Sequence, residues 1–290
     1  MDANKLPCLC GACGKLEKLT NSCQAGLVPL ISTRTLTSFT LLPTTSNPNS
    51  LSDDAGALAL REAAPHGTTI RTYGVTVEAD WQARNLRTNN RGGTDAEVWL
   101  DDEQIATLNL GVPGRHNVRN ALAALAVAHW HGIKAKWAAA MLHDFKGAGR
   151  RFEVIGDADG VVVIDDYAHH PTEVAATLSA ARLRYPTRRI WAVFQPHTYS
   201  RTRTLLDQFA AAFADADHVI VTAIYASRER ATLGISNRDV LAAMQHPDAR
   251  AIDALDDVAQ YLQANAKPGD VVITFSAGDA NKISEALLKG

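Results

Sequence analysis

From Phe152 to the C-terminus, short apolar runs alternate with segments whose apolar residues recur at helical spacing. The apolar runs predict strands at Val161 to Asp165, Ile190 to Gln195, His218 to Ala223 and Val271 to Phe275. The segments between them predict helices near Pro171 to Arg184, Thr202 to Ala214, Asn237 to Gln245 and Asp256 to Asn265. Continuous apolar strands separated by helices are typical of a parallel sheet covered on both faces. The alternation therefore predicts a Rossmann-like α/β domain with a mostly parallel sheet.

The chain before this pattern divides by composition into two stretches. Residues 1–52 are rich in Ser, Thr, Asn and Pro and show little periodicity, which predicts an unstructured leader. Residues 53–148 contain strand patterns and then two helical ones; the strands are predicted at Thr68 to Val77, Ala96 to Leu100 and Gln104 to Leu110. We expect residues 53–148 to form one domain and residues 149–290 to form the Rossmann-like one.

The charge of the chain is nearly balanced, with 29 Lys and Arg against 31 Asp and Glu. Such a chain does not attract nucleic acid or an anionic membrane as a whole, so any partner has to be recognised locally. No apolar run is long enough to cross a bilayer, and the N-terminus lacks a signal-peptide pattern. We therefore expect a cytoplasmic protein with neither a nucleic-acid nor a membrane partner, and the oligomeric state stays open.

All four cysteines lie near the N-terminus, at Cys8, Cys10, Cys13 and Cys23. Zinc sites usually combine two C-x-x-C pairs or one such pair with histidines. Here one pair, Cys10 to Cys13, has neither companion nearby, so we favour an unstructured leader over a metal site.

The first candidate motif lies at a predicted helix start, where residues 114–121 read G-R-H-N-V-R-N-A. An asparagine in this place can read the edge of a planar base, or it can cap the helix. Taken alone, the motif favours a capping role for Asn117.

The second motif, residues 145–153, reads F-K-G-A-G-R-R-F-E and lies between the two patterned regions. Guanidinium groups at such a junction are suited to binding phosphate. A solvated basic turn is an equally good interpretation of this segment alone.

The third motif, residues 165–173, reads D-D-Y-A-H-H-P-T-E and follows a predicted buried strand. Carboxylates there can hold ribose hydroxyls or Mg²⁺ through water, and a histidine can orient or deprotonate an amine. Alternatively, the acidic pair caps the next helix. The adjacent histidines should point apart, which argues against a metal site.

The fourth motif, residues 195–203, reads Q-P-H-T-Y-S-R-T-R and follows the next predicted strand. Arg201 could bind a carboxylate through two hydrogen bonds, as on an amino acid. Otherwise Ser200 caps a helix and Arg201 is a surface residue. Ligands of open α/β sheets bind outside the carboxyl ends of the strands, so we expect the chemistry at this edge.

Together and in this order, the four motifs resemble the Mur ligase family of amide-forming ligases. The resemblance extends from about Asp53 to Gly290 and includes Ala277-Gly278-Asp279. Within the family, the chain is most similar to the branch that joins L-alanine to UDP-N-acetylmuramate, and less similar to the branch that recycles murein tripeptide. The resemblance implies a remnant of the central ATP-binding domain over residues 53–148 and a C-terminal ligase domain over residues 149–290.

The resemblance implies a reaction that uses ATP and Mg²⁺. The lactyl carboxylate of UDP-N-acetylmuramate would be phosphorylated, and the amine of L-alanine would then attack the acyl phosphate. The implied nucleotide contacts are His116, Asn117 and Asn120 at the adenine, Arg151 at the phosphates, Asp166 at the ribose and Tyr167 along the site.

The implied alanine site comes from the third and fourth motifs. His169 and Arg201 would be the catalytic pair that binds the incoming alanine, with Arg201 on its carboxylate. His197 and Ser200 would shape the substrate pocket. No residue is implied as a metal ligand.

The chain departs from the family pattern in two respects. It contains no G-T-x-G-K-T phosphate loop, and Gly11 to Leu16 only echoes one, with Leu16 where a hydroxyl should ligate Mg²⁺. We therefore expect a truncated chain that is inactive or nearly so alone; a binding or regulatory module that keeps the amino-acid pocket is the alternative. In addition, Thr198 and Ser276 stand where the family more often has Arg and Gly.

Overall fold

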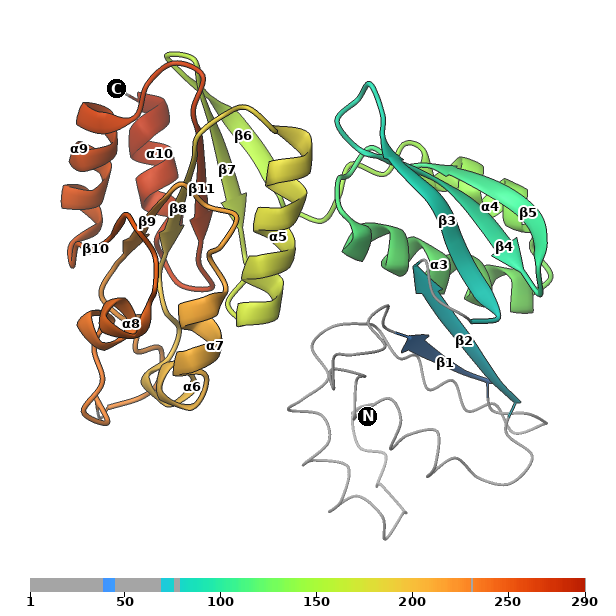
Figure 1. Ribbon diagram of the computed structural model, residues 1–290, viewed down its shortest axis with the longest axis horizontal. Coiled ribbons are helices and arrows are strands. Elements are labelled where there is room, and N and C mark those ends of the chain that lie inside the picture. The colour runs from blue at the N-terminus through green and yellow to red at the C-terminus, as the bar shows by residue number, and fades with distance from the viewer. Residues whose placement is uncertain (1–38, 45–68, 76–78, 231, 290) are drawn as a thin grey trace, which may run out of the picture. The chain divides into compact units, whose positions relative to one another are not determined.

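The computed structural model describes residues 39–44, 69–75, 79–230 and 232–289 (Figure 1). The cysteines and the Gly11 to Leu16 segment lie outside the described residues. Backbone contacts divide the chain into two compact units. Of the described residues, one unit comprises those up to Asn85 with Glu97–Thr107 and Arg119–Ala139, and the other comprises Leu86–Ala96, Leu108–Val118 and those from Ala140 onward.

The N-terminal sheet has the strand order β1-β2-β3-β4-β5. Its strands are β1 (Phe39–Thr44), β2 (Thr69–Val75), β3 (Trp81–Thr88), β4 (Thr94–Leu100) and β5 (Glu103–Asn109). Strand β2 pairs in parallel with β1 and with β3. Strand β1 lies inside the range for which the composition predicted no regular structure. It is the edge strand of this order, where Pro43 is tolerated because an edge needs fewer backbone donors.

A two-residue hairpin joins β4 to β5 through Asp101 and Asp102. Both residues have positive φ, 46° and 64°, which suits the primed turn that connects strands of right-handed twist. The sequence predicted β2, β4 and β5 to within a few residues. It missed β3, whose Gln, Arg and Asn residues hide the buried positions of Trp81 and Ala83.

Two helices follow this sheet, α3 (Arg115–Trp130) and α4 (Ala135–Leu142). Apolar residues at helical spacing along α3 are buried: Val118, Leu122, Leu125 and Ala126. Gly132 follows two residues after the helix end with a φ of 84°, which is common for glycine after a helix. In the part of the chain that the structure describes, no helix is both long and apolar enough to cross a membrane.

The C-terminal sheet has the order β10-β9-β8-β11-β7-β6. Its strands are β6 (Glu153–Ala158), β7 (Val161–Asp166), β8 (Ile190–Phe194), β9 (His218–Val221), β10 (Ala249–Ala251) and β11 (Val271–Phe275). All neighbours pair in parallel except β6, which is antiparallel to β7. The predicted α/β fold class with a mostly parallel sheet is confirmed. Strands β6 and β10, both at the edges, were missed.

Helices cover both faces of this sheet (Figure 1). They are α5 (Pro171–Arg184), α6 (Tyr199–Thr204), α7 (Leu206–Ala211), α8 (Asn237–Ala243), α9 (Leu255–Asn265) and α10 (Asn281–Lys289). The single helix predicted over Thr202 to Ala214 is two helices, α6 and α7, separated at Leu205.

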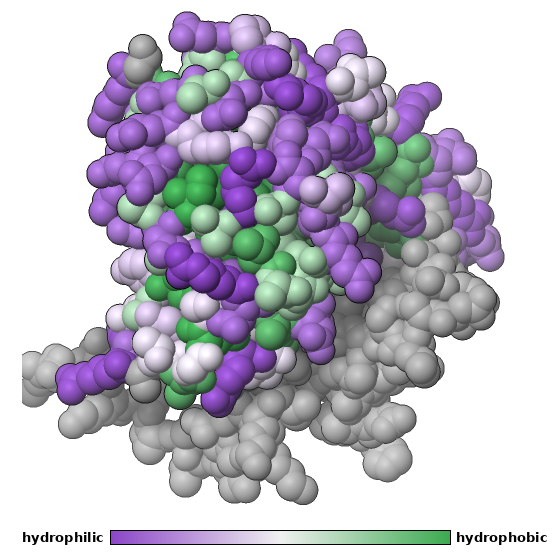
Figure 2. Space-filling view, turned by 60° about the vertical axis from the view of Figure 1, so that its left-hand side comes forward, coloured by the Kyte–Doolittle hydropathy of each residue, from purple (hydrophilic) through white to green (hydrophobic). Residues whose placement is uncertain are grey.

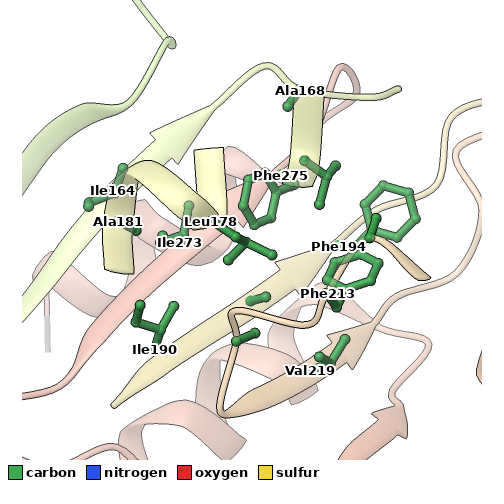
Figure 3. Packing of buried hydrophobic residues seen from close by; sticks show 14 of the residues in the cluster. Ile164, Ala168, Leu178, Ala181, Ile190, Phe194, Phe213, Val219, Ile273 and Phe275 are labelled. Atoms are coloured by element: carbon green, nitrogen blue, oxygen red, sulfur yellow. The ribbon is translucent and has the colours of Figure 1, made fainter. Parts of the chain in front are cut away.

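Successive strand residues supply two separate cores, because side chains of a strand alternate between faces. Ile164, Phe194 and Ile273 pack with α5, α7 and α8 (Figure 3). Val163 and Val193 pack with α9 and α10 on the other face. On the face drawn in Figure 2, hydrophilic residues dominate the upper part, and hydrophobic ones form smaller areas near the centre.

Replacing Phe194 by alanine should lower the free energy of unfolding by about 3–5 kcal/mol. Its ring is fully buried, and its centroid lies 5.0 Å from that of Phe209 and 5.4 Å from that of Phe213. Urea denaturation followed by circular dichroism would measure the change. Leu183→Ala, at an exposed position of α5, is the control and should cost less than about 0.5 kcal/mol. An equal decrease in the free energy of unfolding in the two variants would contradict this description of the core.

Candidate functional site

Three neighbouring strands of the C-terminal sheet end at the same level. Phe275 of β11 is the register partner both of Asp166 on β7 and of Phe194 on β8. The pairing continues one residue further, since the Gln195 amide donates to the Phe275 carbonyl and the Ser276 amide donates to the Asp166 carbonyl, at 3.0 and 2.9 Å. The segments that follow these strands therefore start side by side, as the sequence predicted.

Gln195 ties the ends of β8 and β11 together through its carboxamide. Its oxygen accepts hydrogen bonds from the Ser276 hydroxyl at 2.6 Å and from the amides of Asp279 and Ala280 at 3.1 and 3.2 Å. Its nitrogen donates to an Asp279 carboxylate oxygen at 2.9 Å. The sequence placed Gln195 only at the start of the fourth motif; its position directly after five apolar residues was the signal for a polar residue at a strand end.

Gly278 lets the chain pass close to this carboxamide. A Cβ at this position would lie 2.5 Å from the Gln195 side-chain oxygen and 2.6 Å from Cγ of Tyr225. The A-G-D segment thus needs its glycine for space.

The two adjacent arginines of the second motif are used differently. Arg150, with a φ of 54°, donates from Nε to Asp165 at 2.7 Å and from its guanidinium to the Ser276 carbonyl at 2.9 Å. The Arg151 side chain is 45% exposed and forms an ion pair with Glu173 at 3.2 Å. Arg150 therefore links segments of the domain, whereas Arg151 retains exposed guanidinium surface.

Asp166 is buried, and its carboxylate holds backbone in place. One oxygen accepts from the Phe152 amide at 2.9 Å and the Thr177 hydroxyl at 3.0 Å, and the other accepts from the Ala168 amide at 2.7 Å. Burial raises the pKa of the Asp166 carboxyl above its usual value, although these hydrogen bonds act in the opposite direction. The alternative that the acidic pair caps α5 is wrong, because His170 and Glu173 form that cap.

A row of aromatic rings crosses the strand ends. The ring centroids of Tyr167 and His169 are 5.3 Å apart, and those of His169 and His197 are 6.1 Å apart. The Arg151 guanidinium lies 5.6 Å from the Tyr167 ring at one end of the row. At the other end, Arg201 lies 3.3 Å from Nδ1 of His197. The structure thus brings five of the predicted site residues into one continuous row.

The contacts of the two histidines fix which ring nitrogen carries the proton in the neutral form. His169 Nδ1 lies 2.9 Å from the Tyr167 carbonyl, which can only accept, so Nδ1 is protonated and Nε2 keeps a lone pair. His197 Nδ1 faces the Arg201 guanidinium, which can only donate, so His197 has the opposite tautomer. Burial, followed by the charge of Arg201, lowers the pKa of His197, which favours its neutral form.

Ser200 and Arg201 lie on the first turns of α6, which is anchored by a residue from another loop. The Glu229 carboxylate accepts from the Ser200 amide at 3.0 Å and also from the Ser200 hydroxyl. The helix N-cap, Thr198, makes no side-chain cap bond. Ser200 is therefore not the cap that the alternative interpretation expected, and Glu229 performs that task.

The other predicted residues lie together at the start of α3. His116 and Asn120 are four residues apart and so share a helix face, and Asn117 donates its side-chain amide to the Pro113 carbonyl at 2.7 Å. Gly114 has a φ of 97°, and a Cβ there would lie 2.8 Å from the His116 ring. Asn117 lies inside α3 and its side chain donates to a carbonyl, so it is not the helix cap that the motif alone favoured, and the adenine contact stays a prediction.

Family models match both halves of the described chain. The model of the Mur ligase middle domain matches residues 49–128, and the model described as Mur ligase, glutamate ligase domain, matches residues 150–278. The chain belongs to the Mur ligase family. The family resemblance read from the motifs is confirmed.

Among curated proteins, the relatives of this chain include several that are named UDP-N-acetylmuramate--L-alanine ligase. The one from Caldanaerobacter subterraneus is 43% identical over 222 residues, which are 76% of this chain and 48% of the relative. The one from Gloeobacter violaceus is 47% identical over 214 residues, 73% of this chain and 46% of the relative. The chain spans about half the length of the curated relatives it matches.

Solved Mur ligases share the fold. UDP-N-acetylmuramate-alanine ligase MurC from Thermotoga maritima aligns with a TM-score of 0.64 at 24% identity, covering 86% of this chain and 59% of that one. A murein peptide ligase from Psychrobacter arcticus aligns with a TM-score of 0.61 at 28% identity, covering 87% and 51%. MurF from Thermotoga maritima, solved in complex with ADP, aligns with a TM-score of 0.61 at 20% identity, covering 80% and 51%.

Replacing Asp166 by asparagine should change how stability depends on pH. The raised pKa means that the folded Mur ligase chain holds this proton more tightly than the unfolded chain does, for which about 3.9 is typical. The resulting stabilisation is complete below the unfolded-state pKa and is lost as the pH rises through the folded-state pKa. The variant has no such carboxyl group. The difference in the free energy of unfolding between wild type and variant should therefore decrease as the pH rises from the unfolded-state pKa through the folded-state pKa, as measured by urea denaturation.

The Asp166→Asn variant should also be less stable than the wild type at neutral pH by about 1–3 kcal/mol, because its amide nitrogen would face a donor. Asp257→Asn, at an exposed position of α9, should keep the wild-type pH profile. A profile of Asp166→Asn that runs parallel to the wild type would contradict the raised pKa.

Replacing Glu229 by glutamine should loosen α6. The hydrogen bonds from Ser200 hold the pKa of Glu229 below its usual value, so the ionised carboxylate is the form that anchors the helix. Amide hydrogen exchange over residues 199–204 should accelerate about threefold or more. The matched control is Asp239→Asn, which removes the carboxylate that accepts from Ser236 at the start of α8. It should accelerate exchange in α8 and leave α6 unchanged.

Proposed function

We propose that this chain supplies the amino-acid site and part of the nucleotide site of a ligase that joins L-alanine to UDP-N-acetylmuramate with ATP. The observation that carries the proposal is the row from Arg151 through Tyr167, His169 and His197 to Arg201 across the carboxyl ends of parallel strands. Ligands of open α/β sheets bind at this edge. The names of the curated relatives support the choice of substrates.

Arg201 would bind the carboxylate of the incoming alanine. Its guanidinium already points along the row, since it donates to the His197 carbonyl at 3.0 Å. The planar guanidinium keeps further N–H groups for a carboxylate, which it can bind through two charge-assisted hydrogen bonds. Glu229 would act as a positioning residue, because it anchors the helix that carries Arg201.

His169 would act on the amino group of alanine. An amine must lose its proton before it can attack an acyl phosphate, and a base has to lie within hydrogen-bond reach. The Nε2 lone pair of neutral His169 is suited to that task, because the proton of the ring is on Nδ1, which donates it to the Tyr167 carbonyl. His197, with its Nε2 protonated, would instead donate a hydrogen bond and so shape the pocket together with Ser200.

The nucleotide would lie at the other end of the row. Arg151 would contact the phosphates with its exposed guanidinium, and Tyr167, which is also exposed, would line the site. Asp166 would contribute by holding the backbone of Phe152 and Ala168, since its oxygens are already hydrogen-bonded. His116, Asn117 and Asn120 are proposed for the adenine, as the family resemblance implies.

ATP supplies the phosphoryl group that activates the lactyl carboxylate, and phosphate leaves when the amine attacks. The exposed cation and aromatic ring of Arg151 and Tyr167 fit a nucleotide. The carboxylates at the strand ends do not fit a metal ion: Asp165 is paired with Arg150, and Asp166 accepts from N–H groups. No group of three or more potential metal ligands occurs among the described residues.

We propose the domain division at residues 148 and 149, between the two family matches. The fold is also shared with a murein peptide ligase, whereas the curated relatives at 43% and 47% identity are named for L-alanine. L-alanine is therefore preferred as the test substrate.

Arg201→Ala should weaken binding of L-alanine to the 290-residue chain about tenfold or more, because a charge-assisted bond to a carboxylate is lost. Isothermal titration calorimetry would measure the affinity. Arg203→Ala, an exposed arginine of the same helix, is the matched control and should bind as the wild type does. L-alaninamide, which has no carboxylate, should bind the wild type and Arg201→Ala equally weakly. Tight binding of the amide would contradict the role of Arg201.

Phosphate release with ATP, Mg²⁺, UDP-N-acetylmuramate and L-alanine tests whether these residues suffice for turnover. We expect release at background, because the sequence has no G-T-x-G-K-T loop for the β- and γ-phosphates. Release that requires L-alanine and disappears in Arg201→Ala would contradict this expectation while supporting the alanine site.

A further inference from the structure

The turn between α3 and α4 exposes large apolar side chains. Trp130 is 40% exposed, Ile133 is 50% exposed and Trp137 is 63% exposed. They lie within eight residues of the chain, at the end of α3, in the turn and on the first turn of α4. Single exposed apolar residues are ordinary, but a cluster that includes two tryptophans indicates a contact surface.

Along the sequence, the Lys and Arg residues near this turn have no acidic residue among them. No Asp or Glu occurs between Glu103 and Asp144, although the chain as a whole carries a net charge of −2. Lys134 and Lys136 are exposed, and Nζ of Lys136 lies 5.8 Å from the centroid of the Trp137 ring. The turn therefore combines aromatic and aliphatic surface with two exposed lysines, in a stretch of sequence that contains no carboxylate side chain.

We propose that this turn, with Trp130, Ile133 and Trp137 inserting and Lys134 and Lys136 at the rim, binds the surface of an anionic lipid membrane. Tryptophan partitions to the level of the lipid headgroups, aliphatic side chains reach the acyl chains, and lysines are attracted to anionic headgroups. The nearly balanced net charge predicted no membrane partner, but it does not describe this turn, where the charge is locally positive.

Two other occupants fit the turn less well. A second copy of the chain would bring Lys134 and Lys136 against their own counterparts, and like charges facing each other oppose association. A single-stranded nucleic acid could stack on the tryptophans, but Ile133 between them offers no aromatic face. The surface is thus matched best by a lipid bilayer, which has an apolar interior and, here, anionic headgroups.

The test is co-sedimentation of the full 290-residue chain with lipid vesicles. We expect binding to vesicles of equal parts phosphatidylglycerol and phosphatidylcholine, and much less to pure phosphatidylcholine. Trp137→Ser should reduce the partition coefficient about tenfold. Joint replacement of Lys134 and Lys136 by glutamine should reduce it about fivefold per lysine. The matched control, Leu183→Ser, removes an exposed leucine from α5 and should bind as the wild type does.

Three results would overturn the proposal. The first is an absence of binding to the mixed vesicles, and the second is equal binding by Trp137→Ser and the wild type. The third is evidence for a different partner at this turn. That evidence would be a dimer in light scattering, or binding of a short oligonucleotide, that is present in the wild type and lost in Trp137→Ser. Near-ultraviolet circular dichroism of each variant shows that it is folded. Since no ligase substrate takes part, the outcome is independent of the proposed function.

Discussion

The candidate site depends on the register of three parallel strands, whose carboxyl ends are aligned at one edge of the sheet. Because Phe275 of β11 is in register with both Asp166 and Phe194, the segments after β7, β8 and β11 emerge at one height. The rings of Tyr167, His169 and His197, which come from two of these segments, can then approach within 5.3 and 6.1 Å. A shift of one residue in either pairing would turn the side chains of a whole strand to the opposite face.

Polar residues at this edge fall into two groups with different tasks. Arg150, Asp166 and Gln195 use their hydrogen-bonding groups within the protein. Arg151 and Tyr167 keep exposed surface, and Arg201 keeps donors that its bond to His197 does not use. The first group makes the site rigid, and rigid support lets the second group hold a ligand without losing much conformational freedom on binding.

The sequence predicted the C-terminal sheet well because its central strands are continuous apolar runs, and it predicted that the third and fourth motifs lie at one edge because they follow parallel strands. It could not separate the tasks of Arg150 and Arg151, which depend on a local φ of 54°. It also could not find Glu229, since the bond to Ser200 joins residues 29 apart in sequence. Strand β3 was missed because its polar residues obscure the alternation that burial imposes. The roles of the site residues remain predictions.

Strand β11 is the last strand of its sheet along the chain, yet it lies between β7 and β8. Neither of those strands can complete its pairing until residues 271–275 have been synthesised. Contacts so distant in sequence slow folding, since loop-closure entropy is lost before the pairing forms. During translation, the backbone N–H and C=O groups of β7 and β8 that face β11 therefore stay unpaired until residues 271–275 follow. Unpaired strand edges promote aggregation, so this strand order exposes the incomplete domain to aggregation until its last strand is made.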